Sequence, residues 1–452
     1  MTVSASSTNH IPSAPGAWPL IGHLVPLLRD PLAFLKSLPV HGDLVSVRVG
    51  RFTSVVVCDP GLTLQVLRDD ETYDKGGPLI DRAREVAGEG LATCSHRRHR
   101  RQRRLVQPAF QPDRLGCYAQ AMTEQAEAVT DSWHDGQILD VTAAMTTLTA
   151  QVILATLFSN SLPIDLLRPA VDDVATVVAA TTRRMITPAP LDRLPTRGNR
   201  RYEQARARLR STIDGIVAER RAGVDDQGDL LSALVAARDV ESGGRALPDD
   251  EVADQVVTFF IAGTETAASV LSWGLQLLSG HPDIRRRVQC EVDSVLEGRP
   301  ATYADLPRLE LVNRIIKETL RLWPPVWMIT RVVTRDTELG GYGIPAGTTV
   351  VYSPYLLHHR RDLYPNPDRF DPGRHDSGQC PPGMFIPFGR GARKCVGDRF
   401  AMILAPLALA SITARWTLIP VPGIKVRPSR RVLMAPHGLY MQVAARPQIL
   451  FE

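Results

Sequence analysis

The chain has 452 residues, which is enough for one large domain or for two to three ordinary ones. Hydrophobic residues make up 44% and charged residues 22%, which is the balance of a soluble globular protein with a sizeable core. The six cysteines are scattered, which excludes a disulfide framework and favours a reducing, cytoplasmic setting. The net charge of +5 is compatible with an acidic partner but does not by itself indicate one.

The N-terminal segment is polar and contains prolines, without the basic and apolar regions of a signal peptide. We therefore expect no signal peptide and no membrane anchor, and we expect about residues 1–20 to be flexible. The first regular element is predicted at residues 43–58. There, alternating and β-branched residues flank Gly50 and Arg51 and indicate a β-hairpin.

Helical patterns dominate from about residue 96 to residue 335, with a loop rich in proline and glycine at 185–199. The most apolar stretch, residues 256–278, is long enough to span a bilayer. Its centre contains Glu265, however, and an isolated carboxylate is costly in lipid. We interpret this stretch as the buried central helix of a large soluble protein.

After residue 325 the pattern changes to short strands with glycine turns, followed by an irregular loop at 364–375. A final helix is predicted at about residues 396–414. The chain shows no internal repeat and no flexible linker. The sequence thus predicts a single domain over residues 1–452 of the mainly α (α+β) class, with a large helical part and a smaller β-rich part.

The segment FIPFGRGARKCVG, residues 385–397, surrounds Cys395 with glycine and basic residues. A zinc site would need partners at short spacing and a disulfide would need a second cysteine, and neither is evident. Glycine allows close approach to a flat group, and backbone N–H groups and a following helix N-terminus stabilise a thiolate. These features favour the axial ligand of a haem iron. The alternative is a buried cysteine in a glycine-rich turn.

The stretch FGRGARKCVG matches the signature Phe-x-x-Gly-x-Arg-x-Cys-x-Gly, so the chain resembles the cytochrome P450 family. The resemblance implies the cytochrome P450 fold around a buried haem b, with the Cys395 thiolate as the axial metal ligand. It also implies that Phe388 shields the sulfur, that Arg393 meets a haem propionate, and that Gly397 belongs to the haem-binding loop.

Glu318 and Arg321 resemble the family's Glu-x-x-Arg element, and at this spacing they share a helix face and can pair. The resemblance adds Arg369, from the stretch PDRF, to form a Glu–Arg–Arg cluster beneath the haem pocket. We expect this cluster to be architectural and not catalytic. Taken alone, such a pair would be a solvated helix face.

The stretch AGTET in the long helix resembles the family's oxygen-binding motif. Ala262 and Gly263 keep the helix narrow where it would cross the haem. Thr264 and Thr266 can bond to helix carbonyls and open a groove for dioxygen and water. Thr266 and Glu265 are the catalytic candidates, which would hold dioxygen and relay protons to it. The alternative is a helix N-cap or a packing contact between small residues.

The basic run HRRHRRQRRLVQPAF, residues 96–110, places His99 and Arg103 on one helix face. By resemblance, these two residues and Arg331 contact the haem propionates. Other arginines of the run suit the docking of an acidic electron donor, and they include Arg97, Arg100, Arg101 and Arg104. Such a run can instead be a solvated face or a nucleic-acid patch, but no motif that reads nucleic acid accompanies it.

The resemblance implies a monooxygenase that inserts one oxygen atom from dioxygen (O2) into a C–H bond. We expect no fused flavin or nicotinamide domain, so electrons from NAD(P)H would arrive indirectly, through ferredoxin and ferredoxin reductase. Two other functions stay open. One is a peroxide-driven haem-thiolate enzyme, and the other is a non-enzymatic basic binding protein.

The residues expected to face the substrate are apolar and include no charged anchor, which favours a compact hydrocarbon held by shape. They are Leu79, Ile80, Phe259, Val326 and Trp327, with the 185–199 loop nearby. Trp327 has the alternative of packing in the core. The stretches ETLRLWPPVWMITR and HRRQRRLVQPAF are similar to bacterial terpene-oxidising members such as the pentalenene oxygenases. The expected substrate is therefore a sesquiterpene of an antibiotic pathway, with fatty acids, polyketides and steroids as alternatives.

Overall fold

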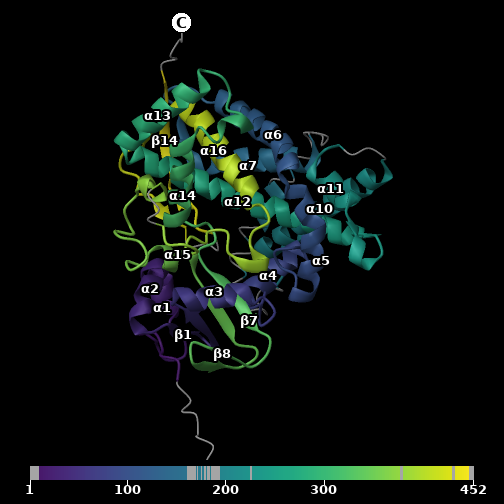
Figure 1. Ribbon diagram of the computed structural model, residues 1–452, viewed down its shortest axis with the longest axis vertical. Helices are drawn as coiled ribbons and strands as arrows, with labels where there is room; N and C mark the ends of the chain where they lie inside the picture. The colour runs from purple at the N-terminus through teal and green to yellow at the C-terminus, as the bar shows by residue number, and fades with distance from the viewer. Residues whose placement is uncertain are drawn as a thin grey trace, which may run out of the picture. The chain divides into compact units, whose positions relative to one another are not determined.

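The structure is a computed structural model (Figure 1). It describes residues 10–159, 169, 172–174, 176–177, 180, 184, 194–223, 227–376, 380–429 and 433–446. The chain divides into two compact units, each assembled from separate stretches of sequence. Unit 1 comprises residues 1–81, 326–369 and 378–395, and unit 2 comprises residues 82–325, 370–377 and 396–452.

Unit 1 is built on a five-stranded sheet in the order β1-β2-β10-β7-β3. Its strands are β1 (Leu44–Val49), β2 (Phe52–Val57), β10 (Thr349–Tyr352), β7 (Ile329–Val333) and β3 (Tyr73–Asp74). β1 and β2 are antiparallel, with Leu44 opposite Val57, which confirms the predicted β-hairpin. β10 runs parallel to β2 and antiparallel to β7, so the strands after residue 325 complete the sheet that the hairpin begins.

The N-terminal segment of unit 1 is attached to β1. Ser13 forms a β-bridge with Ser46, and Gly22 forms another with Val49. The prediction of a flexible segment as far as residue 20 is therefore wrong for the part that begins at Ser13.

Three of the unit 1 helices begin at a proline that follows a capping residue, because proline fits the first helical position. Asp30 accepts a hydrogen bond from Ala33 N, and Asp59 accepts one from Leu62 N. The helices and turns are α1 (Leu24–Arg29), α2 (Pro31–Ser37), η1 (Leu38–His41), α3 (Pro60–Arg68), α15 (Pro354–His358) and η6 (Gly391–Arg393). Strands β8 (Thr337–Leu339) and β9 (Tyr342–Ile344) form a separate hairpin. Helix α4 (Pro78–Ala87) follows β3 in the chain.

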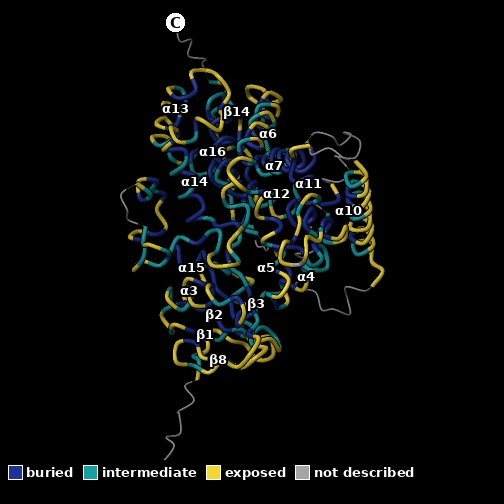
Figure 2. The backbone as a smooth tube through the Cα atoms, turned by 45° about the vertical axis from the view of Figure 1, so that its right-hand side comes forward, coloured by how far each residue is buried: buried dark blue, intermediate teal, exposed yellow. Residues whose placement is uncertain are grey.

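Unit 2 is mainly helical, as the patterns between residues 96 and 335 predict. Its helices are α5 (His96–Val106), α6 (Pro112–Asp131), α7 (Val141–Phe158), α10 (Arg197–Ala222), α11 (Leu230–Ala236), α12 (Asp249–Ser279), α13 (Pro282–Leu296), α14 (Glu310–Leu322) and α16 (Asp398–Arg415). Short 3-10 turns are η2 (Gln107–Phe110), η3 (Val240–Ser242), η4 (Tyr303–Asp305) and η5 (Pro372–His375). Helix α12 packs against both α7 and α16, and Figure 2 shows all three as largely buried. These helices form the core of unit 2.

Short strands complete unit 2. β11 (Trp416–Pro420), β14 (Tyr440–Ala445) and β4 (Ile138–Asp140) form a three-stranded sheet in that order. Two-stranded pairs are β5 (Arg238–Asp239) with β6 (Arg245–Ala246), and β12 (Arg427–Pro428) with β13 (Pro436–His437).

Helix α12 is the long buried helix that the apolar run predicts. Its first turn contains Asp249, Asp250 and Glu251, whose carboxylates stabilise the positive end of the helix dipole. Two helices in the described part of the chain, α7 and α12, are long and apolar enough to cross a membrane. However, 67% and 72% of their most apolar windows are buried inside the protein. This burial supports the interpretation of residues 256–278 as a core helix.

Candidate active site

Cys395 ends a tight loop of unit 1 that begins at Phe388. The backbone N–H of Cys395 donates to the carbonyl oxygen of Phe388 at 2.9 Å and closes the loop. Cys395 is exposed, whereas Cys58 and Cys94 are buried. Helix α16 begins three residues after Cys395, with Gly397 as its N-cap. A helix N-terminus therefore follows the thiol in the chain, as a stabilised thiolate requires.

Two glycines of this loop have backbone conformations that other residues rarely adopt. The φ angle is 68° at Gly389 and 73° at Gly391. A Cβ atom at Gly391 would lie 2.2 Å from the carbonyl oxygen of Leu67, near the end of α3. The loop thus rests directly on α3, and only glycine permits this approach. Gly397 has a φ of −90°, which any residue can adopt.

Arg393 is buried and paired with two carboxylates of unit 1. Its Nη2 lies 2.6 Å from Asp74 Oδ1, and its Nε lies 3.2 Å from Asp70 Oδ2. Both aspartates follow α3, so they attach the Cys395 loop to that part of the chain at two points. The expected contact of Arg393 with a haem propionate stays a prediction, and it would require the guanidinium to bind a third anion.

Arg331 on β7 is a buried cation that pairs with no carboxylate among the described residues. It is 2% exposed. Its guanidinium lies 3.5 Å from both the Thr330 carbonyl and the Tyr352 hydroxyl, at the outer limit of a hydrogen bond. Burial of an unpaired charge is costly, so a buried guanidinium normally has an anionic partner. The environment of Arg331 thus fits its expected role of binding an acidic group.

Glu318 on α14 is the centre of a buried ionic cluster in unit 2. Its carboxylate accepts two hydrogen bonds from Arg321, both at 2.8 Å, and its Oε2 lies 3.0 Å from His375 Nε2. Burial alone raises the pKa of Glu318, but the hydrogen bonds from Arg321 and His375 outweigh burial and lower the pKa to about 2. The carboxylate is therefore ionised and fully engaged, as a structural role requires.

Arg374 is a second arginine that contacts Glu318. Arg374 is 3% exposed, with its Nε 3.4 Å from Glu318 Oε1, whereas Arg369 is exposed. The turn η5 carries Arg374, and the backbone N–H of Asp371 also donates to Glu318 at 3.1 Å. The membership of Arg369 in the cluster stays a prediction. The signal that was missed is the stretch FDPGRH, in which Asp371 caps a turn that begins at Pro372.

The AGTET stretch lies at the centre of α12. Thr266 Oγ1 donates to the Ala262 carbonyl at 2.6 Å, which confirms its predicted bond to the helix backbone. Thr264 differs, because its buried Oγ1 has no hydrogen-bond partner among the described residues, so the bond predicted for it is wrong. Glu265 and Thr266 are half-buried and Ala262 is exposed, so the acid–alcohol pair is accessible within a mainly buried helix.

Helix α5 contains the basic run of unit 2. His99 is buried, and Arg103 is half-buried, with its Nε 3.2 Å from Gln107 Oε1. Their expected contacts with haem propionates stay predictions. The run also contains Arg97, Arg98 and Arg100, which are exposed and form no ion pair within the described part of the chain.

Two other arginines of the run form ion pairs within unit 2. Arg101 Nη1 lies 2.7 Å from Glu251, and its Nε lies 3.2 Å from Asp239. Arg104 Nη2 lies 2.7 Å from Glu241. Arg101 and Arg104 are therefore already paired within unit 2, and their expected role in docking an electron donor stays a prediction.

The predicted substrate-facing residues are found in both units. Leu79 and Ile80 lie in the first turn of α4, and not in a loop as expected. Phe259 is buried in α12, and its ring packs edge-on against Phe110 with the centroids 5.4 Å apart. Residues 185–193 of the predicted loop lie outside the described residues.

Val326 and Trp327 open the second stretch of unit 1. Val326 is half-buried. Trp327 is 8% exposed, and its carbonyl accepts a 2.5 Å hydrogen bond from the Ser353 hydroxyl. This burial agrees with the alternative that Trp327 packs in the core.

Comparison with known proteins decides the family. The family model for cytochrome P450 matches residues 12–443. The chain belongs to the cytochrome P450 family. As a P450 it is an oxidoreductase, which agrees with the motifs around Cys395, Glu318 and Glu265.

Three relatives resemble this P450 over more than nine-tenths of its length. It is 44% identical to cyclooctat-9-en-7-ol 5-monooxygenase of Streptomyces melanosporofaciens, over 91% of this chain and 90% of the relative. It is 43% identical to cyclooctatin synthase of the same species, over 95% of this chain and 94% of the relative. It is 42% identical to pentalenene oxygenase of Streptomyces avermitilis, over 96% of this chain and 97% of the relative.

A solved structure confirms the predicted fold. The crystal structure of the cytochrome P450DA heme domain superposes with a TM-score of 0.86 at 29% identity, covering 97% of this chain and 98% of that one. The cytochrome P450 fold predicted from the motifs is therefore correct.

The family implies a haem-thiolate cofactor, and the residues of this P450 fit it. Cys395 offers an exposed thiol in a glycine loop, and Arg331 offers a buried guanidinium with no acidic partner in the described part of the chain. A soft sulfur ligand suits the iron of a porphyrin, and a buried cation suits the acidic side chains of that porphyrin.

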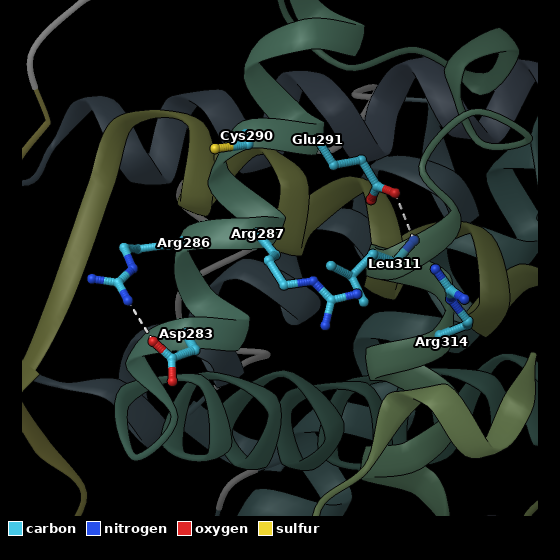
Figure 3. Close-up of a pocket in the computed structure, with 7 residues that line it drawn as sticks. All are labelled: Asp283, Arg286, Arg287, Cys290, Glu291, Leu311 and Arg314. Carbon is cyan, nitrogen blue, oxygen red and sulfur yellow. Dashed lines mark hydrogen bonds and ion pairs between the residues drawn. The ribbon is translucent and has the colours of Figure 1, made fainter.

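A hollow on the surface of unit 2 is a separate feature (Figure 3). It is lined by Asp283, Arg286, Arg287, Cys290, Glu291, Leu311 and Arg314. Glu291 accepts hydrogen bonds from the backbone N–H groups of Leu311 and Val312, so it caps the start of α14. Asp283 pairs with Arg286. The acidic groups of the hollow thus serve the fold, and none of the predicted substrate-facing residues lines it.

Proposed function

We propose that this P450 is a haem-thiolate monooxygenase that inserts one oxygen atom of O2 into a C–H bond of an apolar terpenoid. The observation that carries the proposal is the loop from Phe388 to Cys395, with its exposed thiol and the hydrogen bond that closes it. The terpenoid class is supported by the 42–44% identity to two oxygenases and a synthase that act in cyclooctatin and pentalenene chemistry.

Cys395 and Arg331 have defined roles in this proposal. The haem b, when bound, supplies the activation of dioxygen and the oxidising power. Cys395 would hold the iron as a thiolate, stabilised by the helix N-terminus that follows it. Arg331 would neutralise an acidic side chain of the porphyrin, because its buried charge pairs with no carboxylate in the described chain.

Proton delivery is assigned to Glu265 and Thr266. The Thr266 hydroxyl is oriented by its 2.6 Å hydrogen bond to the Ala262 carbonyl. Because the hydroxyl donates in that bond, its oxygen can still accept a hydrogen bond from a proton donor. Glu265 is half-buried, so its carboxyl group can exchange protons with solvent and pass them to the site. Two protons are needed for each dioxygen that is cleaved with release of water.

The electron donor is proposed to be an acidic ferredoxin, reduced by NAD(P)H through a ferredoxin reductase. Arg97, Arg98 and Arg100 project from α5 as exposed cations that form no ion pair with other described residues. Such charges accelerate the encounter with an acidic protein and cost little to desolvate at the rim of a contact.

Turnover with a panel of substrates tests the proposal. The purified haem protein, ferredoxin, reductase and NADPH would be incubated with cyclic terpenes, fatty acids, a macrolide and a steroid, and products would be identified by mass spectrometry. We expect a hydroxylated terpene and no product from the other classes. Oxidation of a fatty acid or macrolide alone would contradict the substrate class. Activity with hydrogen peroxide but not with ferredoxin would contradict the monooxygenase cycle.

A further inference from the structure

Helix α7 makes a hydrogen bond to the centre of α12, directly beside the acid–alcohol pair. Thr149 of α7 is fully buried, and its Oγ1 lies 2.9 Å from the backbone carbonyl oxygen of Thr264. Thr264 immediately precedes Glu265 and Thr266. A side chain of one helix therefore reaches the backbone of the other at the point where proton delivery is assigned.

The two helices also pack closely at this point. A Cβ atom added at Gly263 would lie 2.6 Å from Cδ1 of Ile153. Ile153 is four residues after Thr149 and so lies on the same face of α7. Helices α7 and α12 run side by side in the views of Figure 1 and Figure 2. The face formed by Thr149 and Ile153 thus fixes the position of the α12 backbone at Gly263 and Thr264.

The carbonyls of α12 around Gly263 accept two hydroxyl groups. Thr266 Oγ1 donates to the carbonyl of Ala262, and Thr149 Oγ1 lies within bonding distance of the carbonyl of Thr264. A hydroxyl bonded to a helix carbonyl tilts that carbonyl away from the helix axis and bends the helix locally. The bond from Thr149 is the one of the two that comes from outside α12, so it connects the α12 backbone at Thr264 to α7.

The Thr149 hydroxyl also has two competing acceptors in its own helix. Its Oγ1 lies 2.8 Å from the carbonyl oxygen of Met145 and 3.2 Å from that of Thr146, and a hydroxyl has one proton to donate. The Thr149 proton is therefore shared between these acceptors of α7 and the Thr264 carbonyl of α12. Thr264 Oγ1 is buried and has no hydrogen-bond partner among the described residues. The Thr264 side chain therefore makes no hydrogen bond that could take the place of the one between Thr149 and the Thr264 carbonyl.

We propose that Thr149 is a positioning residue for proton delivery: its hydroxyl holds the α12 backbone at Thr264 and so orients Glu265 and Thr266. This inference rests on the proposed function of that pair. It is a role for a residue of α7 that touches neither substrate nor cofactor.

The test compares three variants of the haem-loaded enzyme. Thr149→Val removes the hydroxyl at constant shape, and Thr149→Ser keeps it. Thr156→Val is the matched control, because Thr156 is also buried in α7 but, among the described residues, its Oγ1 bonds only within that helix, to the Val152 carbonyl at 2.7 Å. Each valine variant removes one hydroxyl from α7, and only the hydroxyl removed in Thr149→Val lies within hydrogen-bond distance of an α12 carbonyl.

Two measurements are made on each variant. Hydrogen exchange of peptides covering residues 262–268 reports the opening of α12. The peroxide released per NADPH oxidised reports how far NADPH oxidation is uncoupled from oxygenation of the substrate. For Thr149→Val we expect both quantities to rise about threefold or more, because a backbone support beside a proton relay is lost. We expect Thr149→Ser and Thr156→Val to match the wild type in both.

Each other outcome contradicts the inference. If Thr149→Val and Thr156→Val behave alike, the contact with α12 has no role of its own. If exchange rises while peroxide does not, Thr149 stabilises α12 without orienting the pair. A Thr266→Ala variant separates this inference from the proposed function. Full coupling in Thr266→Ala would overturn the proton relay, whereas the exchange data would still decide whether Thr149 holds α12.

Discussion

The guanidinium of Arg393 and the carboxylate of Asp74 are joined at 2.6 Å in the interior of unit 1. The pair connects the loop that ends at Cys395 to the segment after α3, and Asp70 adds a second bond at 3.2 Å. Because Gly391 also brings the loop into contact with the Leu67 carbonyl, the position of the thiol is set by residues more than 300 positions earlier in the chain.

The first prediction concerns Asp74→Asn, which keeps the shape of the side chain and removes its charge. Of the two carboxylates that pair with Arg393 among the described residues, only Asp70 then keeps its charge, and we expect the free energy of unfolding to fall by about 1–3 kcal/mol. We also expect a smaller fraction of the protein to give the thiolate-type carbon monoxide spectrum. Asp69→Asn is the control, since Asp69 accepts a hydrogen bond from Thr72 N and forms no ion pair with Arg393 in the described part of the chain, and its effect should stay below about 0.5 kcal/mol. Equal effects of the two variants would contradict this role of Asp74.

The second prediction distinguishes the two candidate arginines of the Glu318 cluster. Arg374→Ala removes one partner of a buried charge and should destabilise the protein by about 3–5 kcal/mol. Arg369→Ala changes an exposed side chain and should cost about 0.5 kcal/mol or less. Denaturant unfolding with haem absorbance as the signal measures both. A larger loss for Arg369→Ala would restore the assignment based on the PDRF stretch.

The third prediction concerns pH. The pKa of Glu318 is about 2 in the folded protein against an ordinary value of 4.5, so the folded state is stabilised above about pH 4.5. This contribution, about 3 kcal/mol, is lost as the pH falls toward the folded pKa. The advantage of the wild type over Glu318→Gln in unfolding free energy should therefore shrink between neutral pH and about pH 3. An advantage that stays constant would show that the carboxylate is not held ionised.

Comparison with the variant is needed because other carboxylates titrate in the same range. The hydrogen bond from Arg299 lowers the pKa of Asp305. The ionised Asp305 therefore also stabilises the folded state, and this stabilisation is also lost on acidification. Asp305 is present in both the wild type and Glu318→Gln, so its effect cancels in the difference.

The fourth prediction concerns the electron donor. Arg100→Glu reverses an exposed charge that forms no ion pair in the described chain, and it should raise the apparent KM for an acidic bacterial ferredoxin about tenfold at low salt. The effect should shrink as salt is added. Arg287→Glu makes the same change of net charge on α13, in the hollow of Figure 3, and should leave this KM unchanged. Equal effects of both variants would show that only net charge matters.

Local patterns in the sequence predicted the parts of the fold that depend on near neighbours. The alternation in residues 43–58 predicted the hairpin of β1 and β2, and the apolar run around Glu265 predicted the core helix α12. The glycine-rich segment at Cys395 predicted the loop, because its φ angles are set by the residues themselves.

The contacts that were missed join side chains far apart in the chain. Arg374 is carried by η5, whose cap at Asp371 is a local signal, but the contact of Arg374 with Glu318 joins side chains 56 positions apart. Arg393 lies 319 positions from Asp74, and Arg101 lies 150 positions from Glu251. Such pairs appear only once the helices and strands are packed.

The account depends most directly on an ionised Cys395 sulfur bound to haem iron. The carbon monoxide difference spectrum of the reduced protein, compared with that of Cys395→Ala, measures this bond. We predict a thiolate-type spectrum for the wild type and its loss in the variant. An imidazole-type spectrum, or the absence of any haem spectrum from protein expressed with haem supplied, would contradict the account.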